Sequence, residues 1–99
     1  WLERHGPLVR RHARALRASR YVQSHTLDTE LNEALRGSRG AGPPFDGITE
    51  VWWASRAELE AALASPEGRE AARALLADEA RFIDFAASSL FLTEEHAIF

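Results

Sequence analysis

Cysteine, methionine and lysine are all missing from this sequence of 99 residues. Without cysteine the chain cannot form disulfides, use a thiolate in catalysis or build zinc and iron–sulfur sites from Cys ligands. Methionine is absent even from the first position, which is Trp1, so we expect further residues upstream of this sequence. Because lysine is absent, all 12 basic residues are arginines.

Long apolar runs are missing too, and none approaches the roughly 18 residues that a membrane span requires. We therefore expect no membrane partner and a cytoplasmic location. The net charge of −3 argues against a nucleic-acid partner, since that function needs a basic surface facing the phosphates. A hydrophobic content of 45% and a charged content of 27% are typical of one ordinary globular domain.

Helical and strand periodicities alternate along the chain. The first helix is amphipathic: arginines lie opposite an apolar stripe that includes His5 and His12, and Pro7 loosens its turn near His5. Glu79 falls inside the apolar stripe of the last helix, where a carboxylate needs a partner. His12 is expected to be a core histidine bonded to a carbonyl group or to Glu79. The expected elements, in order, are a helix at 1–17, strands at 20–27 and 46–54, a helix at 66–84 and a strand at 89–99.

Shorter signals complete this outline. A short helical turn is expected around Leu31, Ala34 and Leu35, inside a connection that spans residues 28–44. Ser55 followed by Glu58 fits a capping box and begins a short helix that ends near residue 64. Ser65 and Pro66 then start the long helix, with serine as cap and proline at the first helical position.

The order helix, strand, strand, helix, strand predicts an α+β domain with both long helices on one face of an antiparallel sheet. One strand in front of the first helix would complete a β-α-β-β-α-β ferredoxin-like unit. That strand lies inside the sheet, so we expect a gap or an exposed edge between the strands at 46–54 and 89–99.

Strand alternation predicts a His–Glu pair. Tyr21, Gln23 and His25 share one face of the first strand, and Glu50 lies beside Trp52 on the next strand. Val51 and Trp53 are the better pair to face the helices, which would send Glu50, Trp52 and His25 to the opposite face. A register slip of one residue would invert this arrangement.

Five segments, in the right order, resemble motifs of EthD-domain proteins. They are Trp1-x-x-x-His5-Gly-Pro-Leu, Tyr21-Val-Gln-Ser-His25, Phe45-Asp46-Gly47-Ile-Thr-Glu50-Val-Trp52, Asp78-Glu79-x-x-Phe82-x-Asp84 and Thr93-Glu94-Glu95-His96. The resemblance implies that residues 1–99 form one EthD-like domain, incomplete at its N-terminus. It also implies a ferredoxin-like protomer whose sheet packs on that of a second copy, giving a homodimeric α/β barrel with no cofactor.

The resemblance further implies an enzyme for a small hydrophobic, cyclic or aromatic substrate. Lyase or isomerase chemistry, or the oxidoreductase role loosely assigned to the family, would fit. His25, Glu50 and His5 are the candidate catalytic residues, because a carboxylate beside an imidazole can orient the ring and raise its basicity. The candidate substrate-binding residues are Tyr21, Gln23, Trp52 and His96.

The same residues admit plainer interpretations. His25 and Glu50 could be a buried polar pair that merely satisfies itself. The arginines of the first helix form a solvated face in the simplest view. No metal site is expected, since neither H-x-x-x-H nor H-E-x-x-H occurs. The absence of any nucleophile or cofactor motif also leaves open a non-catalytic module that binds a ligand or supports a pathway enzyme.

Overall fold

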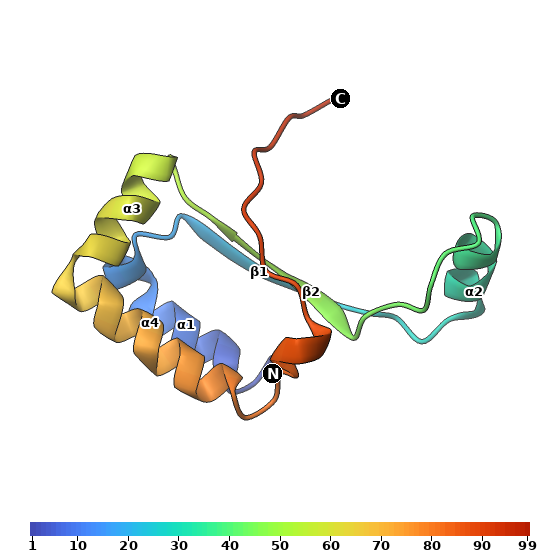
Figure 1. Ribbon diagram of the computed structural model, residues 1–99, viewed down its shortest axis with the longest axis horizontal. Helices are drawn as coiled ribbons and strands as arrows, with labels where there is room; N and C mark the ends of the chain where they lie inside the picture. Colours follow the sequence, from blue (N-terminus) through green and yellow to red (C-terminus); the bar gives the residue numbers. More distant parts are fainter.

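The computed structural model describes all 99 residues and contains a two-stranded antiparallel sheet and four α-helices. This arrangement is α+β and is compatible with a ferredoxin-like fold. Figure 1 shows most of the helices gathered at one end of the paired strands. The elements are α1 (His5–Leu16), β1 (Arg20–His25), α2 (Glu30–Gly37), β2 (Gly47–Trp52), α3 (Arg56–Ala64), α4 (Pro66–Glu79) and a 3-10 turn, η1 (Phe85–Ala87).

Side-chain caps start the helices where the sequence predicts. The Ser55 hydroxyl accepts from the backbone N–H of Glu58 at the start of α3. The Ser65 hydroxyl accepts from the backbone N–H of Gly68 at the start of α4, with Pro66 at the first helical position. Each serine satisfies one of the backbone donors that a helix start leaves unpaired. The two serine caps and the serine–proline start are confirmed, but the capping box is only half formed: the Glu58 carboxylate lies 3.6 Å from Arg17 and does not bond back to the Ser55 backbone N–H. Helix α4 ends at Glu79 rather than near residue 84.

The two strands pair antiparallel over their whole length. Tyr21 lies opposite Val51, Gln23 opposite Thr49, and His25 opposite Gly47. Residues that face each other across a ladder point to the same side of the sheet. Tyr21, Gln23 and His25 therefore share a face with Val51.

Both long helices lie on that face, as expected from their single apolar stripes. In Figure 1 the hairpin is seen nearly edge-on, with α1 and α4 side by side below it. The Trp53 indole N–H donates to the backbone carbonyl of Leu16 at the end of α1, at 2.7 Å. This contact confirms that Trp53 packs under the helices. We call this side of the sheet the helix face and the other side the open face.

A small core holds the three helices together. Val9 of α1, Ala62 of α3 and Ala71 of α4 are almost completely buried. Gly68 allows α4 to begin directly against α3, because a Cβ at this position would lie 1.9 Å from the carbonyl oxygen of Ala62. A larger residue at position 68 would push the two helices apart.

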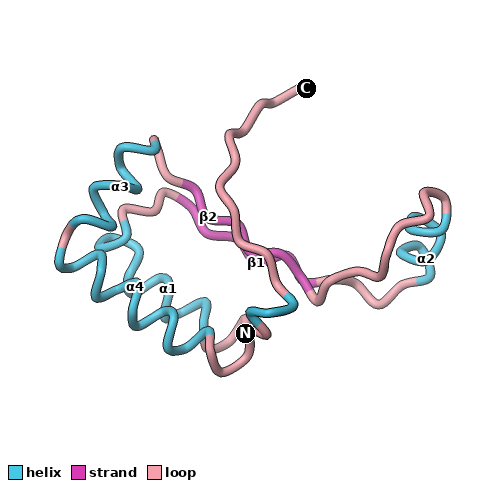
Figure 2. Tube along the Cα trace, in the orientation of Figure 1, coloured by secondary structure: helices cyan, strands magenta, loops and turns pink.

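Helix α2 stands at the far end of the hairpin, away from the other helices (Figure 2). Thr29 caps it by accepting from the backbone N–H of Leu31. Leu31 and Leu35 remain exposed. The helical turn expected in the connection is thus a helix of two turns that projects from the sheet.

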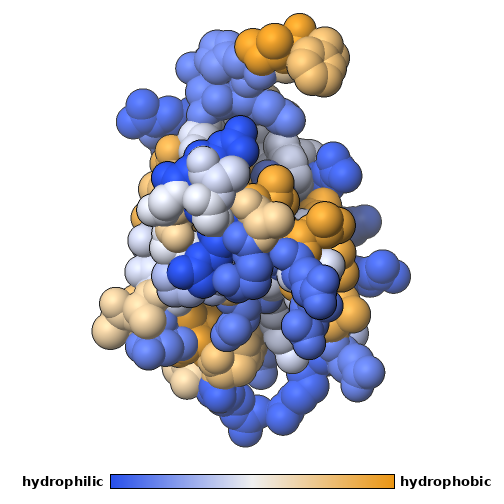
Figure 3. Space-filling model, turned by 90° about the vertical axis from the view of Figure 1, so that its right-hand side faces the viewer, coloured by the Kyte–Doolittle hydropathy of each residue, from blue (hydrophilic) through white to orange (hydrophobic).

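The strand expected at 89–99 does not form, and residues 88–99 run as an exposed tail. A strand needs the backbone groups of a neighbouring strand, and only β1 pairs with β2. The outer edge of β2 has no strand beside it, but the expected gap between two strands cannot arise because the strand at 89–99 is absent. A side-chain contact ties the tail to the open face: the Trp52 indole N–H donates to Glu95 Oε2 at 2.9 Å. Figure 3 shows hydrophobic atoms at the top of the molecule, where the chain ends in Figure 1.

The sequence predicted correctly which residues of β2 face the helices, but it predicted the wrong side for the residues of β1. Val51 and Trp53 lie on the helix face, and Glu50 and Trp52 on the open face, as predicted. Because Glu50 pairs with Val22, whereas His25 pairs with Gly47, His25 and Glu50 point to opposite sides. Tyr21 and Gln23 also lie on the helix face. The predicted His25–Glu50 pair on the open face is therefore corrected: a relative register one residue away would have been needed to form it.

Candidate functional site

A hydrogen-bonded row of three side chains runs along the helix face of β1. The Gln23 amide N–H donates to the Tyr21 hydroxyl at 3.0 Å. His25 Nε2 lies 3.0 Å from Gln23 Oε1. Alternate residues of a strand project to the same side, so β1 itself brings the three together. We call Tyr21, Gln23 and His25 the polar row.

Trp1 covers the outer end of this row. Its ring lies 4.2 Å from the His25 ring, centroid to centroid, at a tilt of 45°. Gly47, the partner of His25 across the ladder, makes room for the indole. A Cβ on Gly47 would lie 2.6 Å from a ring carbon of Trp1. The stack therefore depends on the glycine.

The inner end of the row approaches a buried histidine. His5, in the first turn of α1, is only 3% exposed, and its ring centroid lies 6.4 Å from that of Tyr21. Its Nδ1 lies 2.9 Å from Asp78 Oδ2 on α4. The Phe82 ring meets it edge-on at 5.3 Å. Gly6 lies next to His5 in α1, and a Cβ there would meet the Gln23 amide nitrogen at 3.8 Å, which places the start of α1 against β1.

Glu79 gives this cluster a second carboxyl group. Its Oε1 lies 3.8 Å from His5 Nε2, which is too long for a hydrogen bond but short enough for an electrostatic interaction. Burial raises the pKa of Glu79 above its ordinary 4.5; the His5 charge opposes this rise and the Asp78 charge adds to it. The carboxyl group in the apolar stripe of α4 is therefore costly to ionise, and its neighbour is His5 rather than His12.

The partners of each histidine define its donors and acceptors. A glutamine carbonyl oxygen can only accept, so the bond to Gln23 requires that His25 Nε2 carries the proton. Neutral His25 then has a free lone pair on Nδ1, and it is an exposed residue. In His5, the bond to Asp78 places a proton on Nδ1, but burial closes that ring to solvent. Of these two histidines, only His25 has a ring that solvent can reach.

The other expected site residues lie elsewhere. Glu50 is exposed on the open face. On the same face, the guanidinium carbon of Arg20 lies 4.8 Å from the centre of the Trp52 ring. Of the seven expected residues, the structure gathers His5, Tyr21, Gln23 and His25, and separates Glu50 and Trp52 from them.

The remaining histidines take no part in this arrangement. His96 belongs to the exposed tail, where its Nε2 lies 3.7 Å from Glu94 Oε2. His12 is half-buried in α1 and makes no side-chain hydrogen bond, so the expected bond to a carbonyl or to Glu79 is wrong.

No cluster of three or more metal-binding side chains forms. No helix of the fold has the length and apolar character needed to cross a membrane.

Sequence reasoning missed two members of the site. Trp1 is the first residue of the apolar stripe that contains His5, and Asp78 stands directly before Glu79 in α4. Both residues occur in segments that resemble EthD motifs, and that resemblance could have marked them as candidates. Trp1 contacts His25 and Asp78 contacts His5 only because of the way α1 and α4 pack on the sheet. The hydrophobic periodicity of the sequence does not predict this packing.

Comparison with known proteins identifies the family. The family model of the EthD domain matches residues 1–86, which include the polar row, Trp1, His5 and Asp78. No curated protein and no solved structure shows a significant match to the chain. Because the match covers most of the sequence, the chain belongs to the EthD-domain family.

Proposed function

We propose that this chain acts on a small hydrophobic, cyclic or aromatic substrate by acid–base chemistry, with His25 as the proton-exchanging group. The observation that carries the proposal is the polar row, which fixes the proton on Nε2 of His25 and leaves Nδ1 free. Histidine suits this role because its charge changes near neutral pH.

Trp1 would supply the binding surface for such a substrate. Its indole lies beside the His25 ring, and it is only partly covered. A planar ligand could stack on this aromatic wall with its reacting atom next to Nδ1. Tyr21 and Gln23 would be positioning residues that hold the His25 ring in its orientation.

The proposed step moves one proton. His25 Nδ1 takes a proton from a carbon next to a carbonyl group, and the C–H electron pair becomes part of an enolate. The Nε2–H of the resulting imidazolium still donates to Gln23 Oε1, so the ring keeps its orientation. Return of the proton at another carbon completes an isomerisation. Return to a leaving hydroxyl, which departs as water, completes a dehydration.

The test follows exchange of an acidic C–H bond in a simple cyclic ketone that is fused to a benzene ring. Incubated with 2-tetralone in D₂O, the chain should speed loss of the α-proton signal in the NMR spectrum. His25→Ala should lower the protein-dependent rate by about a hundredfold. His12→Gln, which changes a histidine outside the row, should leave it unchanged. A His25→Ala chain that exchanges as fast as wild type would refute the proposal.

Non-catalytic binding is the second candidate, and the exposure of the Trp1–His25 stack favours it. An aromatic wall alone can hold a hydrophobic ligand, whether or not a proton moves. In that case 2-tetralone would shift the Trp1 and His25 ring signals without any gain in exchange. Wild-type chain that shows both shifts and exchange would exclude this candidate.

We propose that a second copy of the chain packs against the open face of the sheet. Ile48 is 59% exposed there, on the same face as the half-covered side chains of Val22 and Trp52. Apolar side chains on an uncovered sheet favour packing against another sheet, and the EthD resemblance implies such a homodimer. Sedimentation equilibrium should give twice the chain mass for wild type and the single mass for Ile48→Glu. Wild type that stays monomeric at high concentration would contradict the dimer.

A further inference from the structure

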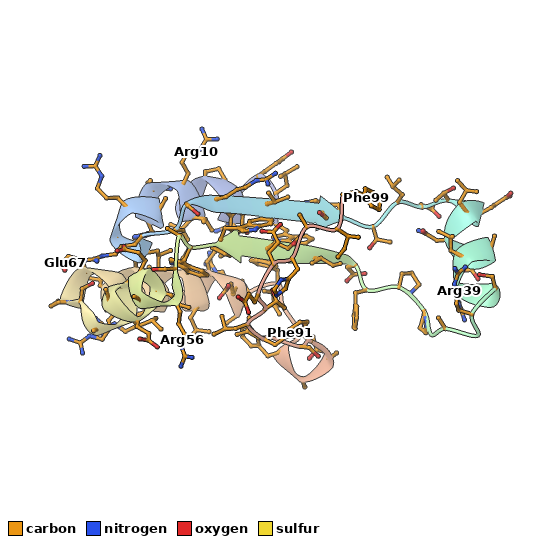
Figure 4. The ribbon with its side chains drawn as sticks, turned by 90° about the horizontal axis from the view of Figure 1, so that it is seen from above. Arg10, Arg39, Arg56, Glu67, Phe91 and Phe99 are labelled. Atoms are coloured by element: carbon orange, nitrogen blue, oxygen red, sulfur yellow. The ribbon has the colours of Figure 1, made fainter.

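The solvent face of α1 carries a row of arginines that the proposed reaction does not use. Arg10, Arg11 and Arg14 belong to the helix, and Arg4 is its N-cap residue. All four are exposed, and they lie opposite the buried His5 and Val9. In Figure 4 the Arg10 side chain points away from the body of the protein. We call these four residues the arginine face.

No carboxylate of this chain neutralises the arginine face. The one arginine next to α1 that has an acidic partner is its C-cap residue, Arg17, which lies 3.6 Å from Glu58. The first 20 residues hold six arginines and a single acid, Glu3, and so carry +5. The other residues carry −8, which accounts for the net charge of −3. Positive charge is therefore concentrated in a chain that is acidic elsewhere.

This concentration does not stabilise α1. Arg10 and Arg14 are four residues apart and Arg11 and Arg14 three apart, so like charges face each other along the helix. Arg4 stands at the N-terminal end, where the helix dipole favours an acid, and the first turn has none. Only Arg14, in the last turn, is favoured by the dipole. Helix stability gives no reason for the pattern, whereas recognition of an anionic partner does.

We propose that the arginine face of α1 binds an acidic surface of a second protein. Guanidinium groups pair with carboxylates through two parallel hydrogen bonds, which lysine cannot do. The 12 residues of α1 give a face about 18 Å long, the size of a local patch on a protein. A nucleic acid is disfavoured because its continuous charge would extend past α1 to the acidic remainder of the chain.

The arginine face and the polar row lie on opposite sides of α1. A docked acidic protein would thus leave Trp1 and His25 open to a ligand. Charge complementarity of this kind acts mainly on association rate and on salt dependence. The proposal does not depend on whether His25 is catalytic.

The experiment measures binding of fluorescent polyglutamate of about 50 residues, in low and in roughly physiological salt. Wild type should bind, and salt should weaken the complex. The double variant Arg10→Glu/Arg14→Glu should bind at least about tenfold more weakly. Arg69→Glu/Arg73→Glu is the matched control, with the same spacing on the exposed surface of α4, and should bind like wild type. If the charge reversal unfolds the chain, Arg10→Gln/Arg14→Gln replaces it.

Three outcomes would overturn the proposal. Wild type could fail to bind polyglutamate, or the α4 control could lose as much affinity as the α1 variant. Tighter binding to duplex DNA, or to vesicles of anionic lipid, than to polyglutamate at equal charge would assign the face to a different partner. The exchange rate with 2-tetralone should be the same for Arg10→Glu/Arg14→Glu and wild type, which separates this result from the test of His25.

Discussion

His25 and Glu50 project from opposite faces of the hairpin, because His25 pairs with Gly47 and Glu50 with Val22. The carboxylate that His25 was expected to use is therefore out of reach. Gln23, two residues earlier on the same strand, is its partner instead. His25 is therefore held by a neutral amide and not by a carboxylate.

Gln23→Leu should slow exchange of 2-tetralone by about tenfold, because it removes the acceptor that orients His25. The fold should persist, since Gln23 is only half-buried. Gln23→Glu keeps an acceptor at the same place and should recover most of the rate. Equal rates for the leucine variant and wild type would show that Gln23 does not position His25.

Gly47→Ala should displace the Trp1 ring, because the new Cβ would lie 2.6 Å from both the ring and the backbone oxygen of Ser24. We expect a loss of about 1–3 kcal/mol in the free energy of unfolding. Binding of 2-tetralone, followed by tryptophan fluorescence, should weaken. Gly42→Ala is the control, since nothing lies within 4 Å of its Cβ position. Unchanged binding in Gly47→Ala would remove Trp1 from the site.

Asp78→Asn should lower the free energy of unfolding by about 1–3 kcal/mol, because it weakens a hydrogen bond to a buried histidine. Urea unfolding measures the loss. The exposed pair of Glu94 and His96 serves as a comparison, and Glu94→Gln should have no measurable effect. If both variants lost a similar free energy of unfolding, burial of His5 would not explain why its bond to Asp78 stabilises the fold.

Glu79→Gln should stabilise the fold, and more so near pH 7 than near pH 4. Burial raises the pKa of Glu79, so the folded state binds its proton more tightly than the unfolded state. The corresponding stability is present below about pH 4.5 and is lost as the pH rises through the raised pKa. The variant has no such loss. Thermal unfolding at the two pH values measures the difference, and a gain that is larger near pH 4 would have the wrong sign.

Much of the fold follows from local signals. The serine caps of α3 and α4 and the side of β2 that meets the helices could be read from the sequence, because Val51 and Trp53 are plainly apolar. The faces of β1 could not, since each side mixes polar and apolar residues. Residues 26–46 connect the two strands and include a whole helix, so no tight turn sets the register.

Whether residues 89–99 form a strand, and which residues meet in the site, depend on long-range contacts. Local sequence patterns do not predict such contacts. Leu90, Phe91 and Leu92 look suited to a strand, but a strand forms only where a neighbour offers its backbone. His5, Tyr21, Gln23 and His25 were all candidates from their residue types. Their grouping required the position of α1 over β1, which brings Gly6 close to Gln23 and the Trp1 ring close to Gly47.

Nitrogen NMR of the His25 ring tests the central claim most directly, because it needs no substrate. With ¹⁵N-labelled histidine at a pH where the ring is neutral, long-range proton–nitrogen correlations distinguish the two tautomers. The polar row predicts a protonated Nε2 and a free Nδ1, and Gln23→Leu should make the two forms more equal. A wild-type ring with its proton on Nδ1 would contradict the account, because the nitrogen proposed as the base would have no lone pair available to accept a proton.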